Sequence, residues 1–82
     1  MSGIEARDLI LDRMAAFETQ TGRTPSMVRL PLLIALDFAK LRRSQIGPVS
    51  GLVMRHGVRI LERTGLYGLR VQIIKSGALQ FA

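Results

Sequence analysis

The longest apolar block in the chain, Pro31–Arg43 (PLLIALDFAKLRR), constrains the fold more than any other stretch. Proline suits the first position of a helix, because its missing N–H and its fixed φ cost nothing there. Leu, Ala and Lys favour helix, and Arg42 and Arg43 complement the negative end of the helix dipole. Apolar side chains surround almost the whole predicted helix, leaving a narrow strip of Asp37 and Lys40. Such a helix needs cover on more than one side, from a sheet and another helix or in part from a second subunit.

The length of 82 residues predicts one domain, residues 1–82. A domain this small buries only about 60% of the surface of its unfolded chain, whereas 48% of its residues are hydrophobic. The apolar excess favours a homo-oligomer or docking on another protein. There is no Cys, which excludes disulfides and thiolate sites. The N-terminus lacks signal-peptide character and the central block is too short to span a bilayer, so we expect a soluble, cytoplasmic protein without a membrane partner.

The net charge of +6 is unevenly distributed along the chain. Residues 1–22 carry two arginines and four carboxylates, for a net charge of −2, and residues 23–82 carry ten cations and two carboxylates, for +8. Ten of the twelve cations are Arg, which favours bidentate contacts with phosphate or carboxylate. The asymmetry predicts either an anionic partner for residues 23–82 or contact between oppositely charged parts.

A capping box precedes an amphipathic helix predicted over residues 3–20. Ser2 and Glu5 fit the S-x-x-E pattern, and Gly22 suits the position after the helix. One face is apolar and comprises Ala6, Ile10, Met14 and Phe17. The opposite face carries Glu5, Asp8, Asp12 and Thr19. Asp8 and Asp12 lie one helical turn apart, but two carboxylates without a third ligand indicate a solvated face rather than a metal site.

The other segments are short runs separated by turns. Residues 26–30 predict a strand, placed at a sheet edge by the prolines on either side, and the glycines and proline of residues 44–51 predict a loop. Residues 52–55, 58–61 and 69–74 predict strands, the last two forming a hairpin through 63–67, and residues 78–81 a final strand. Alternation in the hairpin directs Val58, Ile60, Leu69, Val71 and Ile73 to the core, and Arg59, Arg70 and Gln72 outward.

These elements predict an α+β fold in the order α-β-α-β-β(-β). Two helices would pack on one face of a small, mainly antiparallel sheet, with the central helix against the inward side chains of the hairpin.

Catalytic chemistry has little support in this sequence. The only histidine, His56, lies beside a glycine in a predicted turn and has no acid near it in sequence. A catalytic triad or a zinc site needs partners of a kind that the chain barely contains, and no glycine-rich phosphate-binding motif occurs. We therefore expect no enzyme activity, no cofactor and no metal.

A basic surface provides an alternative to a protein-interaction role. The cations that could form a nucleic-acid-binding face are Arg42, Arg43, Arg55, Arg59, Arg63, Arg70 and Lys75. A platform for single strands needs aromatic residues on that face, and only Tyr67 is available. A ribbon-helix-helix fold is disfavoured, because glycines and a proline follow the central helix.

Part of the chain resembles small proteins of tailed phages and prophages. In those proteins a G-x-x-P turn leads a strand into a Leu-rich helix, and a later Gly-[Ile/Val]-x-[Val/Ile] starts a strand. The matching residues here, within about residues 20–75, are Gly22, Pro25, Gly57, Val58 and Ile60. The resemblance implies a virion or assembly component and no particular site residues. We therefore expect a non-enzymatic interaction or assembly module that self-associates, with nucleic-acid binding as the alternative.

Overall fold

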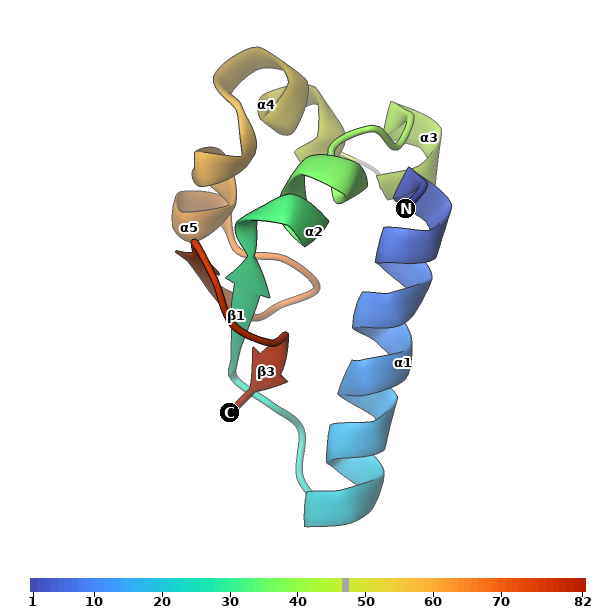
Figure 1. Cartoon of the computed structure of the whole chain (residues 1–82), viewed down its shortest axis with the longest axis vertical. Helices are drawn as coiled ribbons and strands as arrows, with labels where there is room; N and C mark the ends of the chain where they lie inside the picture. The colour runs from blue at the N-terminus through green and yellow to red at the C-terminus, as the bar shows by residue number, and fades with distance from the viewer. Residues whose placement is uncertain (47) are drawn as a thin grey trace.

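A computed structural model has the α+β architecture that the sequence predicts (Figure 1). It describes residues 1–46 and 48–82, and the side chains of these except at positions 43, 46 and 48–50. In chain order, the elements are α1 (Gly3–Thr21), β1 (Met27–Pro31), α2 (Leu32–Phe38), α3 (Arg43–Ile46), α4 (Pro48–His56), the 3-10 helix η1 (Val58–Ile60), α5 (Leu61–Thr64), β2 (Arg70–Ile74) and β3 (Gln80–Phe81).

Helix α1 forms as its capping signals predict. The Ser2 hydroxyl accepts a hydrogen bond from the Glu5 amide, the Glu5 carboxylate accepts one from the Ser2 amide, and both span 3.1 Å. Gly22 ends the helix in the left-handed region, with φ 71°. Ala6 and Ile10 are fully buried. The helix therefore presents its predicted apolar face to the core.

The sheet is mixed, with strand order β2-β1-β3. Strands β1 and β2 are parallel over five residue pairs, from Met27↔Arg70 to Pro31↔Ile74, and β1 and β3 are antiparallel over two pairs. The expected mainly antiparallel sheet is thus corrected, and β1 is the central strand instead of an edge strand. Its prolines do not prevent this, since Pro25 precedes the strand and Pro31 is its last residue, leaving the N–H donors between them in place.

The segment between α2 and β2 is helical, which corrects several predictions. Residues 52–55 belong to α4, residues 58–61 form η1 and the start of α5, and no hairpin runs through residues 63–67. Residues 44–46 and 48–51 belong to α3 and α4 instead of a loop, while residue 47 lies outside the described residues. The reason is topological: two parallel strands need a crossover connection, which is usually helical. Val58, Leu69, Val71 and Ile73 are nevertheless buried, and Arg59, Arg70 and Gln72 are exposed, as predicted. Ile60, also predicted in the core, is half-buried against it.

Helix α2 is shorter and more exposed than expected. It ends at Phe38, so Arg42 and Arg43 lie beyond it instead of in its last turn. Ala35 and Phe38 are fully buried, but Leu33 and Leu36 face solvent. The described part of the chain thus covers α2 on only part of its circumference.

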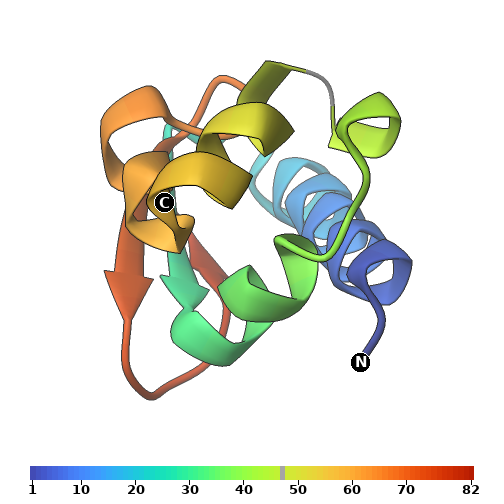
Figure 2. The same cartoon turned by 90° about the horizontal axis from the view of Figure 1, so that it is seen from above.

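The core lies between the sheet and the helices. In Figures 1 and 2, α1 stands on one side and the sheet on the other, with α2 and α4 across the upper end. The largest fully buried side chains are Phe38, Ile10, Leu30, Leu61 and Val28. Among the described residues, no helix combines the length and the apolar character that crossing a bilayer requires.

Candidate interaction surfaces

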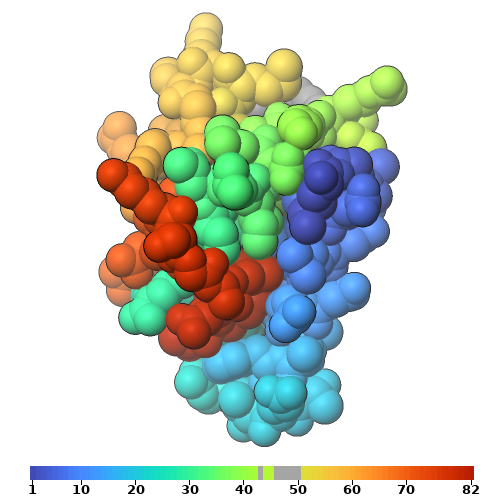
Figure 3. All heavy atoms as spheres, in the orientation of Figure 1, coloured from blue at the N-terminus to red at the C-terminus, as the bar shows by residue number. Residues whose placement is uncertain are grey.

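Helix α2 carries an exposed apolar surface, which we call the α2 apolar face and define as Leu33 and Leu36. The exposed fraction is 73% for Leu33 and 46% for Leu36. The two residues are three positions apart, so they lie on one side of the helix. Ile4, with an exposed fraction of 45%, is at the start of α1, which Figure 3 shows beside α2 on the same side of the molecule. This arrangement leaves large apolar side chains in water on two adjacent helices.

The side of α2 opposite the α2 apolar face is tightly packed. Beneath it Phe38 is fully buried, and Gly3 of α1 packs so closely that an added Cβ would lie 3.0 Å from the Leu41 backbone nitrogen. At its edge, Lys40 Nζ lies 2.8 Å from Asp37 Oδ1. The hydrogen bond from Lys40 holds the pKa of Asp37 below its ordinary value. The apolar face is therefore bordered by one negative and one positive charge.

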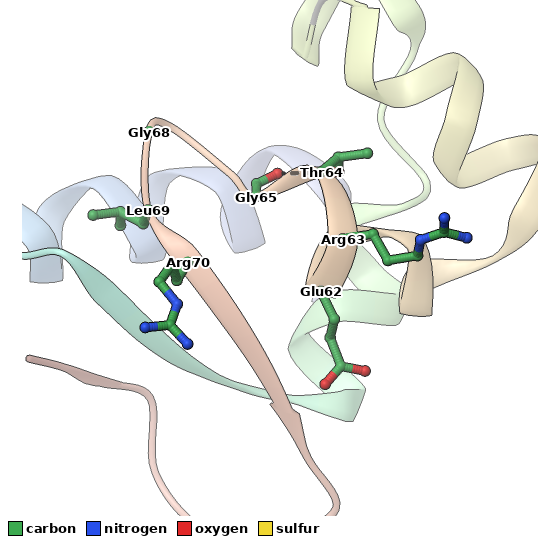
Figure 4. Close-up of a pocket in the computed structure, with 7 residues that line it drawn as sticks. All are labelled: Glu62, Arg63, Thr64, Gly65, Gly68, Leu69 and Arg70. Carbon is green, nitrogen blue, oxygen red and sulfur yellow. Dashed lines mark hydrogen bonds between the residues drawn. The ribbon is translucent and has the colours of Figure 1, made fainter.

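The structure brings several predicted basic residues together at one side. His56, Arg59, Ile60 and Arg63 line a hollow of about 300 Å³. Arg63 also lines a second hollow, of about 290 Å³, together with Arg70 and the turn residues between α5 and β2 (Figure 4). We call Arg59, Arg63 and Arg70 the basic cluster.

One carboxylate, that of Glu62, accompanies the basic cluster. Its Oε1 lies 3.0 Å from Arg59 Nη1, and its Oε2 accepts a hydrogen bond from the Ile73 amide at 3.4 Å. Glu62 therefore joins α5 to the outer edge of β2 and neutralises the positive charge of Arg59. No ion pair involves Arg63 or Arg70 among the described residues.

The other four predicted nucleic-acid-binding residues are Arg42, Arg43, Arg55 and Lys75. Those whose side chains the structure describes do not line the two hollows. Arg55 is exposed in the last turn of α4. Arg42 follows α2, and its amide donates to Gln45 Oε1. Lys75 follows the end of β2, about 16 Å along an extended strand from Arg70. The side chain of Arg43 lies outside the described residues. Of the seven predicted cations, Arg59, Arg63 and Arg70 line the two hollows, and a nucleic-acid-binding face that comprises all seven stays a prediction.

The open face of the sheet carries a residue that the sequence analysis did not select. Arg29 in β1 is exposed between the buried Val28 and Leu30. Its neighbours in register are Gln72 on β2 and Gln80 on β3, and both are exposed. The alternation around Arg29 already indicated an outward side chain, but its neighbours depend on strand pairing.

His56 lines a hollow at the end of α4, and Asp8 lies on the acidic face of α1. The hollow beside His56 is lined by two arginines and an isoleucine, with no carboxylate. Asp8 lies 3.2 Å from Arg7. Within the described residues, no group of three or more potential metal ligands occurs.

Comparison with known protein families, with curated proteins and with solved structures finds no match to this chain.

Proposed function

We propose that this chain is a non-enzymatic interaction module that self-associates through the α2 apolar face. The observation that carries the proposal is the exposure of Leu33 and Leu36 on a helix whose other side is buried in the core. A fully buried leucine contributes about 1.5–3 kcal/mol, so two leucines from each of two copies supply several kcal/mol. Because association costs roughly 4–15 kcal/mol, we expect a weak dimer, with a Kd no tighter than about 1 µM even at the favourable ends of both ranges.

A second copy of the chain is the partner that best fits this surface. A twofold interface uses the same patch on both subunits and must therefore be self-complementary. The border of the α2 apolar face carries Asp37 and Lys40, so two copies approaching in opposite directions can place unlike charges together.

Sedimentation equilibrium of the whole chain tests this proposal. Leu33→Glu with Leu36→Glu is expected to give a monomer, since burying carboxylates between two copies is unfavourable. Met54→Glu is the matched control, because Met54 in α4 has an exposed fraction of 72%, against 73% for Leu33. A wild-type chain that stays monomeric at high concentration, or a double variant that still dimerises, would refute the proposal.

The second candidate function is nucleic-acid binding through the basic cluster. It is supported by two hollows that share Arg63, one of which is also lined by a single carboxylate, that of Glu62. In Figure 4, Arg63 and Arg70 extend in different directions from α5 and β2. They flank the hollow without converging on it, which suits an extended polyanion better than a single small anion.

Salt dependence tests the second candidate. Three phosphate contacts predict that the affinity for duplex DNA falls roughly 40-fold as the salt concentration rises from 50 to 200 mM. Arg59→Glu with Arg70→Glu is expected to abolish binding. Arg13→Glu with Arg23→Glu, which changes the net charge equally at the other end of the chain, is expected to weaken it only slightly. Binding that is absent at low salt or insensitive to salt would remove this candidate.

A further inference from the structure

Three polar side chains form a row across the open face of the sheet. Arg29 on the central strand is in register with Gln72 on one side and Gln80 on the other. Residues directly opposite in a sheet project from the same face, and all three are exposed. A hollow of about 360 Å³ opens beside Arg29 and Gln80. The row is thus a surface that is accessible over all three strands.

Among the described residues, the three strands carry no acidic side chain, and Glu62 reaches only the outer edge of β2. Four of the six carboxylate residues lie on α1, Asp37 is in α2 and Glu62 is in α5. In β2, Arg70 lies two positions before Gln72. This arginine of the basic cluster therefore projects from the same face as the row. The charge of the open face therefore complements a polyanion.

The width of the row matches one groove of DNA. Neighbouring strands lie about 4.8 Å apart, so the backbones that carry Gln72 and Gln80 are separated by roughly 10 Å. The major groove of B-DNA is about 12 Å wide and the minor groove about 6 Å. The major groove admits a two-stranded ribbon, so the three strands remain outside it and only the side chains of the row reach in, whereas the minor groove is too narrow for the row.

We propose that this row reads base edges in the major groove of duplex DNA. Arginine makes bidentate hydrogen bonds to guanine O6 and N7, and glutamine makes them to adenine N6 and N7. Arg70 contacts the backbone from the start of β2.

Other nucleic acids fit the open face less well. A single strand binds to stacked aromatic rings, but Tyr67 packs on Phe38 and Phe81 on Phe17, and Phe17 and Phe38 belong to α1 and α2. The major groove of an RNA duplex is too narrow for side chains to read. The proposal rests on the nucleic-acid-binding function proposed above and adds to it the base-reading residues and the form of the ligand.

Binding selection from a duplex DNA pool with a randomised centre tests this proposal on the whole chain. We expect enrichment of a short motif that contains guanine and adenine. Arg29→Ala is expected to reduce discrimination at one guanine position, and Gln72→Ala or Gln80→Ala at an adenine position, each by about 5- to 150-fold. Arg13→Ala and Gln20→Ala, on exposed positions of α1, should leave the motif unchanged. Circular dichroism establishes that each variant is folded.

The outcomes separate this inference from the function on which it rests. Duplex binding without a motif, or a motif that survives Arg29→Ala, would overturn the base-reading row and leave phosphate binding by the basic cluster intact. Tighter binding to single-stranded DNA or to an RNA duplex would also overturn it. Absence of binding to every nucleic acid at low salt would overturn both proposals.

Discussion

The ring of Tyr67 meets the ring of Phe38 edge to face, with ring centroids 6.3 Å apart and ring planes at 88°. Tyr67 has φ 52°, the only positive φ of a non-glycine residue among those described. In the same turn, Leu66 and Leu69 exchange two backbone hydrogen bonds, of 3.0 and 2.8 Å. The contact therefore ties the turn before β2 to α2, the helix that carries the α2 apolar face.

Truncation of Phe38 should be among the most destabilising single changes. Phe38→Ala empties a fully buried site and is expected to lower the free energy of unfolding by about 3–5 kcal/mol. Phe38→Leu fills part of the cavity and should cost clearly less. Chemical denaturation measures both. Equal losses for the two variants would contradict the view that the ring volume and the edge contact matter.

Stability at alkaline pH should depend on Tyr67. Burial raises the pKa of the Tyr67 hydroxyl above its ordinary value of 10.0, so the folded chain holds this proton more tightly than the unfolded chain does. The free energy of unfolding should therefore decrease as the pH rises above 10.0 and through the raised pKa. Tyr67→Phe should remove this part of the decrease in a series of denaturation curves. An identical slope in the variant would assign the decrease to other groups.

The capping box should give two separable effects at the start of α1. The Ser2 backbone N–H, followed by the Ser2 hydroxyl, lowers the pKa of Glu5 below its ordinary value of 4.5. The stability that this provides is present above pH 4.5 and is lost as the pH falls through the lowered pKa. Glu5→Gln should flatten this slope. Ser2→Ala should cost about 1 kcal/mol at neutral pH but keep much of the slope, because the backbone N–H remains.

Two glycines in the same backbone conformation should tolerate alanine differently. Gly57 has φ 79° and ψ 176°, and Gly65 has φ 76° and ψ 178°. Alanine is strained at either position, by about 1–3 kcal/mol. A Cβ at Gly57 meets no atom within 4 Å, whereas a Cβ at Gly65 lies 2.7 Å from the Leu69 carbonyl oxygen. Thermal unfolding should show a larger loss for Gly65→Ala, and equal losses would refute the steric argument.

Charge reversal at the border of the α2 apolar face should weaken the proposed dimer. Lys40→Glu places only negative charge beside Asp37, so two copies would bring like charges together. We expect the dimer Kd to increase about tenfold, equivalent to roughly 1.4 kcal/mol. Asp37→Lys combined with Lys40→Glu restores both signs and should restore the affinity. A single reversal that leaves sedimentation unchanged would show that the interface lies elsewhere.

Helix α1 and the alternation of β2 were predictable because their signals are local. The capping box joins residues three positions apart, and a glycine in the left-handed region ends the helix. In β2, the alternation of exposed Arg70 and Gln72 with buried Val71 and Ile73 follows from the pleat of any strand, whichever strand is its partner. The amino-acid sequence alone therefore determined these elements, their inward faces and the α+β class.

Only the tertiary structure decided how the strands pair. This pairing determines which apolar runs become helical and which polar side chains lie together. The short apolar runs around Val53 and Val58 suit a strand or a helix equally well, and the parallel pairing of β1 with β2 makes them part of a helical crossover. The same pairing places Arg29 between Gln72 and Gln80 and brings Arg63 near Arg70. The exposure of Leu33 also depends on which elements pack on α2. These relationships join residues far apart in the chain, so their energies are absent from any local sequence pattern.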